Sequence, residues 1–433
     1  MMGMINRTID WVDARLPVVE AFRKHMSEYY APKNFNILYY FGVFSMVVLV
    51  NQLLTGIWLT MFYSPSDAFA SVEYIMRDVQ YGWLIRYLHA VGASAFFAVV
   101  YIHMFRGLMY GSYKPPRELV WIFGMLIYVA LMAEGFLGYV LPWGNMSYWG
   151  AQVIISLAGA VPYDMLPFIN DAEGKEIGEA LVTWVRGDYL LSEATINKFF
   201  ALHVVAIPLV LVALVVLHIL ALHEVGSNNP DGVEIKQNKD ENGIPKDGIA
   251  FHPYYTVKDT MGIVVFMAVF LTVVFFFPDG GGYLLERPNF EPANPLKTPA
   301  HIAPVWYYGP YYAMLRATTL EFIFNSKTWG LIAMGGAIVI LFLVPWLDRH
   351  PVKSIRYKGW VSKVAMALFV VTFLGLGYLG TQPADNSFIG VSFKKWAQVG
   401  TVYYFFYFLV VLPFAHRFEK SKPVPERVTG GAH

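Results

Sequence analysis

Two stretches of the chain decide its fold: 83–109, WLIRYLHAVGASAFFAVVYIHMFRGLM, and 194–223, ATINKFFALHVVAIPLVLVALVVLHILALH. Each is a mainly apolar run that can cross a hydrocarbon core of roughly 30 Å as one helix, which takes about 20 residues. The first carries His89 and His103, and the second carries His203 and His218. Ionisable side chains at membrane depth are rare and usually functional. The four histidines are therefore candidate functional residues.

The rest of the chain also has the composition of a membrane protein. Of its 433 residues, 56% are hydrophobic and 15% are charged, whereas soluble domains carry about 25% charged residues. The net charge of +1 creates no field that would attract nucleic acid, so we expect no such partner. The apolar segments predict an all-α integral membrane protein with eight transmembrane helices, at 37–62, 83–109, 119–141, 194–223, 260–277, 328–347, 360–379 and 399–414.

These spans divide the chain into four regions. We expect an N-terminal arm (1–36), a four-helix bundle (37–225), a polar linker (226–258) and a C-terminal region of four helices (259–433) with a long loop between the fifth and sixth spans. The polar arm predicts no signal peptide. Loops on the side of the termini carry about twice as many Lys and Arg residues as the opposite loops, which predicts cytoplasmic termini. The two longest loops then lie outside, and long loops are usually functional.

Helical geometry pairs the four histidines across two helices. His89 and His103 are 14 residues apart, about 40° short of four turns, and His203 and His218 are 15 apart, about 60° past four turns. Because one span separates these two helices, they run parallel, so His89 faces His203 at one depth and His103 faces His218 at another. Facing neutral imidazoles suit axial ligation of haem iron. For a single histidine, a hydrogen bond to a neighbouring helix is the alternative.

Glycines repeat the histidine interval on the other two helices of this bundle. Gly42 and Gly56 are 14 residues apart, as are Gly124 and Gly138. Glycine leaves room where something bulky must approach the backbone, so these positions favour two porphyrins against the first and third spans. Ordinary close packing of helices is the alternative.

Two arginines flank the histidines of the second span. Arg86 precedes His89 by three residues, and Arg106 follows His103 by three. Both lie toward the interfaces, where haem propionates would need cations. Alternatively, each side chain snorkels to the membrane surface.

Several longer stretches carry a resemblance to a known family. They are RYLHAVGAS (86–94), HMFRGLMYGSYKPPREL (103–119), GYVLPWGNMSYWGA (138–151), HEVGSNNPDG (223–232) and TPAHIAPVWY (298–307). The chain resembles the cytochrome b subunit of bacterial quinol–cytochrome c oxidoreductases, the cytochrome bc complexes or respiratory complex III. The resemblance implies two b-type haems, a low-potential one on His89 and His203 and a high-potential one on His103 and His218.

The resemblance also implies partners and a location. The chain has no cysteine, so an iron–sulfur cluster or a c-type haem must belong to other subunits. A Rieske-type iron–sulfur protein, a c-type cytochrome subunit, membrane quinone and lipid, and a homodimer of the complex in the bacterial inner membrane are therefore expected. The chain is unsplit and lacks the cysteine that attaches an extra haem in the photosynthetic branch, which favours the respiratory or purple-bacterial type.

An outer site for quinol oxidation follows from the resemblance. It would lie between the third span, the segment with Tyr148, and the loop with Pro304, Trp306 and Tyr307, and would send one electron to the iron–sulfur protein and one through the two haems. Most members have a glutamate where this chain has Val305. We hypothesise that Glu134, a charge inside the third span, accepts the proton from quinol instead. A structural carboxylate bonded to a neighbouring helix is the alternative.

A second quinone site is expected at the cytoplasmic face, with proton translocation as the result of the two sites. The resemblance makes His223, Ser227 and Asp259 quinone contacts and Lys258 a proton-entry residue. Without the resemblance, these residues would be interpreted as ordinary residues of the membrane interface.

Two other classes of protein also place histidines inside membrane helices. A dihaem anchor of a dehydrogenase usually has about five spans and lacks long outer loops. A transporter with a histidine proton relay would show internal repeats or interrupted helices. A reduced-minus-oxidised spectrum of the purified complex separates these classes.

Overall fold

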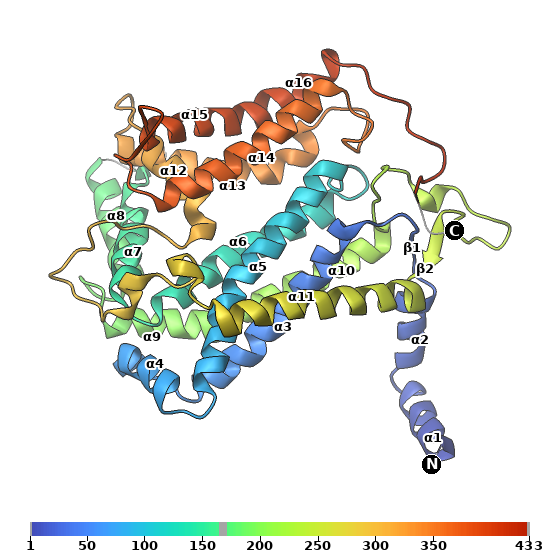
Figure 1. Cartoon of the computed structure of the whole chain (residues 1–433), viewed down its shortest axis with the longest axis horizontal. Coiled ribbons are helices and arrows are strands. Elements are labelled where there is room, and N and C mark those ends of the chain that lie inside the picture. The colour runs from blue at the N-terminus through green and yellow to red at the C-terminus, as the bar shows by residue number, and fades with distance from the viewer. Residues whose placement is uncertain (1, 164–170, 431–433) are drawn as a thin grey trace.

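Eight long apolar helices run side by side, roughly along the long axis of the molecule (Figure 1). The structure is a computed structural model that describes residues 2–163 and 171–430. In this part of the chain, eight helices are long and apolar enough to cross a membrane, which confirms the predicted number. They are α3 (Tyr40–Thr60), α5 (Gly82–Tyr110), α6 (Glu118–Val140), α9 with α10 (Glu193–Ala201 and Ile207–Val225), α11 (Thr256–Phe276), α13 (Ser326–Leu347), α14 (Trp360–Thr381), and α15 with α16 (Phe393–Phe406 and Leu412–Phe414).

Two spans begin earlier than the sequence predicts. The fifth starts with a π-helical turn at Phe251 rather than at residue 260, and the eighth starts at Phe393 rather than at residue 399. Both additional first turns contain polar residues, HPYYTVKD in one and FKKWAQ in the other. Hydropathy identifies only the apolar part of a helix. These two helices extend beyond their apolar parts, so the sequence placed their starts too late.

The helices pack as two groups. In the first, α3 lies against α5 and α6 lies against α10, and α11 packs on α3 and α5. In the second, α13, α14 and α15 surround the short α12 (Gly309–Ala317), and α13 contacts α6 (Figure 1). The fifth span, α11, therefore packs with the first four spans.

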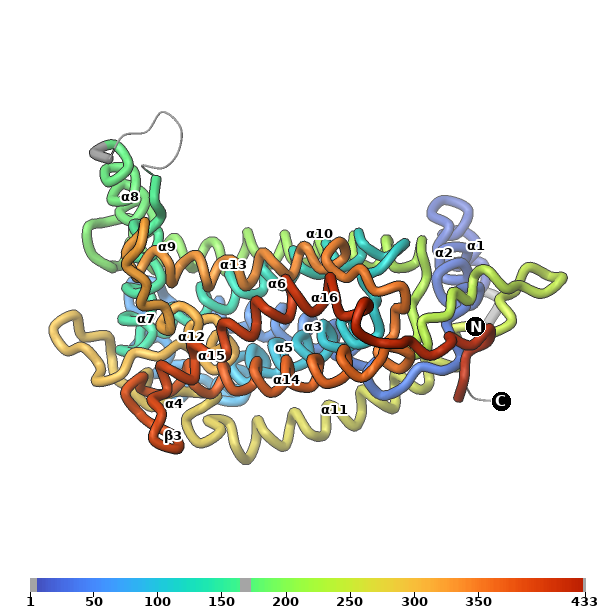
Figure 2. Tube along the Cα trace, turned by 90° about the horizontal axis from the view of Figure 1, so that it is seen from above, coloured from blue at the N-terminus to red at the C-terminus, as the bar shows by residue number. Residues whose placement is uncertain are grey.

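The termini and the long loops lie at opposite ends of the bundle (Figure 2). At the terminal end, α1 (Met2–Asp13) and α2 (Val18–Phe22) lead to β1 (Tyr30–Pro32), which pairs antiparallel with β2 (Gly248–Ala250). The opposite end holds the short helices of the loops and a small hairpin. These are α4 (Ala68–Arg77), α7 (Asn145–Ser156), α8 (Asp171–Arg186), α12, and β3 (Ser387–Phe388) with β4 (Val391–Ser392).

A buried carboxylate ties the terminal end together. Asp231 is completely buried and accepts hydrogen bonds from Asn34, Arg356, Tyr357 and Thr429 at 2.7 to 3.1 Å. These residues come from the arm, the loop after α13 and the C-terminal tail. Burial alone would raise the pKa of Asp231, but the hydrogen bonds from Thr429 and Tyr357 and the ion pair with Arg356 hold this pKa below its ordinary value.

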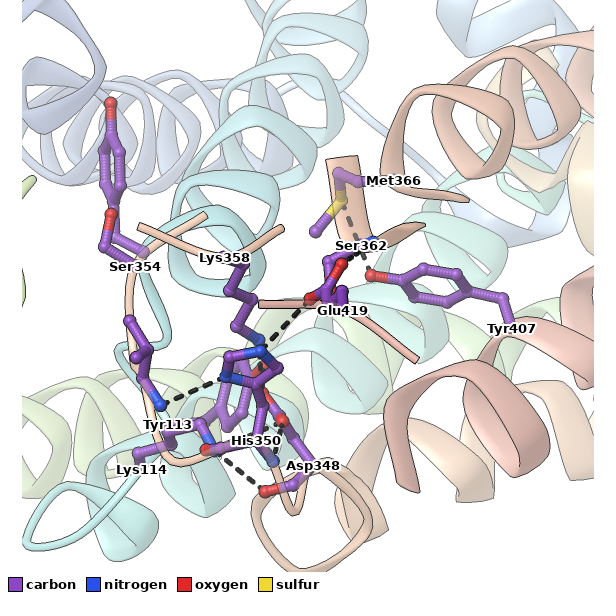
Figure 3. Close-up of polar contacts among 12 residues, drawn as sticks. Tyr113, Lys114, Asp348, His350, Ser354, Lys358, Ser362, Met366, Tyr407 and Glu419 are labelled. Carbon is purple, nitrogen blue, oxygen red and sulfur yellow. Dashed lines mark hydrogen bonds and ion pairs between the residues drawn. The ribbon is translucent and has the colours of Figure 1, made fainter. Parts of the chain in front are cut away.

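A second polar cluster fixes the loop between α13 and α14 (Figure 3). Asp348 accepts a hydrogen bond from Tyr113 (2.6 Å) and is paired with Lys114 (3.2 Å) and Lys358 (2.9 Å). His350 contacts Glu419 of the tail at 3.1 Å. The buried charges compensate one another, so the cluster holds the loop and the tail in place.

Candidate functional site

The outer pair of histidines places two imidazole rings opposite each other, with their planes at 88°. The ring centres of His89 and His203 are 6.2 Å apart. The His89 Nδ1 lies 2.9 Å from the Thr55 hydroxyl, and the His203 Nδ1 lies 3.0 Å from a carboxylate oxygen of Glu134 and 3.1 Å from its carbonyl. Metal-bound histidines typically donate the second ring nitrogen to such partners. The Nε2 atoms are thereby left for a ligand.

The inner pair repeats this arrangement at another depth. The ring centres of His103 and His218 are 6.4 Å apart, and the His218 Nδ1 lies 2.9 Å from the Val120 carbonyl. An ion bound about 2 Å from each of two imidazole nitrogens separates the ring centres by roughly 6 Å. In the described ranges, no group of three or more His, Cys, Asp or Glu side chains could hold a metal ion. Two protein ligands at each level fit a metal whose remaining ligands come from a porphyrin.

A π-helical turn explains the unequal histidine intervals. Residues Leu202–Ala206 form this turn between α9 and α10, and His203 lies within it. Each π turn accommodates one residue more than an α turn, so the 15-residue interval from His203 to His218 acts like the 14-residue interval from His89 to His103. The extra residue therefore does not rotate His203 away from its partner.

The four predicted glycines each lie against one of the four histidines. A Cβ atom added at these glycines would meet the Cε1 atom of a histidine at 2.4 to 3.4 Å. The pairs are Gly42 with His103, Gly56 with His89, Gly124 with His218, and Gly138 with His203. The glycines therefore make room for the imidazole rings, and their contact with porphyrin remains a prediction.

Arginines lie beside both histidine pairs. Arg106 stacks over the Tyr39 ring at 4.8 Å, and its buried Nε has no hydrogen-bond partner among the described residues. Arg86 lines the cavity next to the outer pair. A buried guanidinium group with an unused donor fits a carboxylate ligand such as a haem propionate.

The cavity beside the outer histidines has a volume of about 510 Å³. Its walls combine residues of the histidine pair with residues of the loop between α11 and α12. Glu134, Val305 and Tyr307 line it, whereas Tyr148, Pro304 and Trp306 do not. The structure therefore brings part of the predicted quinol site together around one space.

Contacts of the aromatic side chains fix the Pro304–Tyr307 segment. Tyr307 stacks on Phe97 with ring centres 3.9 Å apart, and its carbonyl accepts a hydrogen bond from Tyr101. Trp306 donates to the Ser94 hydroxyl at 3.1 Å. Tyr148 is buried against Trp143 instead. Trp306 and Tyr148 are thus placed to shape the surroundings of the cavity.

Sequence reasoning missed Glu286, a carboxylate in this cavity. Glu286 lines it and accepts a hydrogen bond from the Tyr139 hydroxyl. Burial raises the pKa of Glu286 to about 7, although the bond from Tyr139 acts in the opposite direction. The residue lies in a loop, LLERPNF (284–290), where no helical or strand periodicity indicates burial.

At the terminal end, residues of the N-terminal arm contact two residues of the predicted second quinone site. The His223 ring stacks on Tyr29 (4.4 Å between centres), and its Nδ1 lies 3.0 Å from the His25 Nδ1. Tyr29 also contacts the Ser227 hydroxyl at 2.9 Å. His25 and Tyr29 were not predicted, because the arm has no apolar pattern that would place it there.

Lys258 and Asp259 lie in the first turn of α11. The Lys258 ammonium group donates to Tyr254 at 3.0 Å. In the described part of the chain, neither side chain forms a hydrogen bond to His223 or Ser227. The structure therefore links His223 to Ser227 through Tyr29. Lys258 and Asp259 lie next to each other on α11 and are not part of this cluster.

A bundle of membrane-spanning helices with facing imidazole pairs defines the class of membrane-bound b-type cytochromes. Two family models match the chain, Cytochrome b/b6/petB over residues 26–226 and Cytochrome b(C-terminal)/b6/petD over residues 292–405. The chain therefore belongs to the cytochrome b family, whose members bind b-type haem and serve electron transport.

Curated relatives and a solved structure agree with this placement. The chain is 55% identical to cytochrome b of Allochromatium vinosum, over 98% of this chain and 99% of the relative. It is 47% identical to cytochrome b of Rickettsia bellii, over 98% of each. A solved chain described as hyperthermophilic respiratory complex III matches with a TM-score of 0.82 and 38% identity, over 95% of this chain and 99% of the other.

Proposed function

We propose that this chain is the catalytic subunit of a bacterial quinol–cytochrome c oxidoreductase, which oxidises quinol at its outer end and reduces quinone at its cytoplasmic end. The observation that carries the proposal is the set of two facing imidazole pairs at two depths, with a cavity beside one of them. Its membership of the cytochrome b family and its likeness to a chain described as complex III support it.

The residues of the bundle suit two b-type haems. His89 with His203 would hold one haem, His103 with His218 would hold the other, and Arg86 and Arg106 would pair with the propionates. Bound haem supplies one-electron carriers at the two depths. The protein holds the imidazoles in orientation through hydrogen bonds to three of the four Nδ1 atoms.

Because His89, His203 and Arg86 also line the outer cavity, a haem held by the two histidines would fill part of it. Quinol oxidation is proposed for the part of the cavity next to Val305 and Tyr307. Tyr307 stacks on Phe97 at its wall, and the aromatic side chains of the lining would shield the ring of the substrate from water. One electron would go to a Rieske-type iron–sulfur protein, and the other would cross the membrane. The hypothesis that Glu134 accepts a proton remains a prediction, since its carboxylate is the hydrogen-bond partner of His203.

Quinone reduction is proposed for the cluster at the terminal end. His223 and Ser227 offer a ring nitrogen and a hydroxyl that can hydrogen-bond the quinone oxygens. Asp259 and Lys258 follow as proton-supplying residues from α11. Uptake of protons here and release at the outer end would give proton translocation, with the termini in the cytoplasm and the chain in the bacterial inner membrane.

The remaining partners are a c-type cytochrome subunit and a second copy of the complex. An assay of the complex purified from membranes tests the proposal. Quinol should reduce added oxidised cytochrome c, and His203→Leu and His218→Leu should each abolish this activity. A complex that contains haem but does not reduce cytochrome c with quinol would favour a dehydrogenase anchor, and a chain without haem would favour a transporter.

A further inference from the structure

The Glu286 carboxylate sits in the wall of the outer cavity and lacks a cationic partner. It lines this cavity together with Val305 and Tyr307. Its Oε2 atom accepts a hydrogen bond from Tyr139 on α6. Among the described residues, no Lys, Arg or His forms an ion pair with it. A half-buried carboxylate that is not neutralised by a cation is costly to keep in place, which suggests a function.

The backbone around Glu286 is fixed by the loop between α6 and α9. The Ser147 amide donates to the Asn289 side chain at 2.9 Å, and the Asn145 amide donates to the Glu291 carbonyl at 2.8 Å. A Cβ atom at Gly144 would lie 2.2 Å from Asn289 Oδ1, so only glycine permits this close approach. The two long loops are thereby joined, and the carboxylate is held at the cavity.

We propose that Glu286 is the residue that accepts a proton from quinol in the outer cavity. The inference rests on the proposed function. In the step, the O–H bond of a quinol hydroxyl breaks, its electron pair stays on the quinol oxygen, and the proton forms a new bond to a carboxylate oxygen of Glu286. No electron moves in this step. The neighbouring Arg287 is exposed, so the loop that carries Glu286 reaches the protein surface, where the proton would be released.

The electrostatic surroundings suit this role. Tyr139 from α6 and Tyr307 from the turn before α12 are the titratable groups that face Glu286, and Arg86 and Glu134 line the same cavity. Burial raises the pKa of Glu286 to about 7. A proton acceptor works best when its pKa is close to the operating pH.

The other residues of the cavity are less suited. Val305 has no polar atom. The Glu134 carboxylate is engaged 3.0 Å from the His203 Nδ1, which makes it a positioning residue for that imidazole. Glu286 instead accepts its hydrogen bond from Tyr139, which is not a proposed haem ligand, so its carboxylate is better placed to take up a proton.

The test is quinol–cytochrome c reductase activity of the intact complex from pH 5.5 to 9, with haem content measured on each sample. Wild-type turnover should rise with pH, with a midpoint near 7, because the ionised carboxylate is the acceptor. Glu286→Gln should keep both haems, lose about 100-fold in turnover at pH 8 and lose this pH dependence. Tyr139→Phe removes the bond that lowers the Glu286 pKa, so its midpoint should move to higher pH.

Glu291→Gln is the matched control, because Glu291 lies in the same loop but is exposed and paired with Lys297 at 3.7 Å, and it does not line the cavity. Its turnover and pH midpoint should equal those of the wild type. A Glu286→Gln complex with wild-type turnover and midpoint would overturn the inference. If that variant does not assemble, an unchanged midpoint in Tyr139→Phe would overturn it. A wild-type complex without quinol-dependent activity would instead reject the proposed function.

Discussion

Replacing Gly138 with alanine should selectively disturb the outer histidine pair. The added Cβ atom would lie 2.4 Å from the His203 Cε1 and 3.0 Å from its Nε2. Non-bonded carbon atoms settle at about 3.5–4.0 Å, so the imidazole must move by roughly 1 Å to accommodate the methyl group. Its Nδ1 is held by Glu134, so this movement also strains a hydrogen bond.

The size of the effect follows from this overlap. Inserting a methyl group into a packed interior typically costs about 1–3 kcal/mol. Since about 1.4 kcal/mol corresponds to a factor of ten in an equilibrium constant, haem affinity at the outer pair should fall about 5- to 140-fold. Gly124→Ala is the matched control, because its Cβ atom would meet the His218 Cε1 at 3.4 Å, an ordinary contact distance.

The assay is the haem content of each purified variant after extended washing in detergent, measured as the pyridine haemochrome and expressed per polypeptide. Gly138→Ala should lose haem from one of two sites, while Gly124→Ala should retain both. Equal haem retention in the two variants would refute the reasoning that Gly138 makes room for the His203 ring.

Three further predictions concern Thr55 and Glu134, which contact the histidines, and Asp231, which holds the C-terminal tail. Thr55→Val removes the partner of the His89 Nδ1 and should weaken haem binding about 10- to 100-fold, measured by the same washing assay; unchanged retention would contradict this. Glu134→Gln should change the absorption spectrum or midpoint potential of the haem on His203. If this variant instead loses the pH dependence of turnover, Glu134 and not Glu286 would be the proton acceptor. Asp231→Asn should release the tail, increasing its cleavage by added protease. Because the Asp231 pKa is lowered in the folded protein, its contribution is present at neutral pH and is lost as the pH falls through that pKa, and a tail equally protected in both proteins would contradict the prediction.

The spans and the histidine pairs could be predicted because both depend on local sequence. Apolar runs of helical length must bury themselves or face lipid, and the eight predicted spans are confirmed. The spacing of His89 and His103 fixes a shared helix face without knowledge of tertiary structure. For His203 and His218, an ideal α-helix places the two side chains about 60° apart around the helix axis. The π turn at Leu202–Ala206 takes up the extra residue and removes this difference. A one-residue insertion in a helix gives no hydropathy signal.

The side-chain surroundings of the sites depended on tertiary packing and could not be predicted. Glu286 lies in a loop whose position is set by bonds to residues about 140 positions earlier in the chain. His25 and Tyr29 reach His223 because β1 pairs with β2, and this pairing involves only three residues of each strand. The sequence located Glu134 inside a span, but only the structure reveals its contact with His203.

The most direct test of the account is the number of b-type haems per polypeptide in the purified wild-type complex. The two imidazole pairs predict two haems, each held by two histidines, and His103→Leu should leave one haem on His89 and His203. A wild-type chain with a single haem, or a His103→Leu variant that still binds two, would contradict the arrangement of ligands on which the proposed function depends.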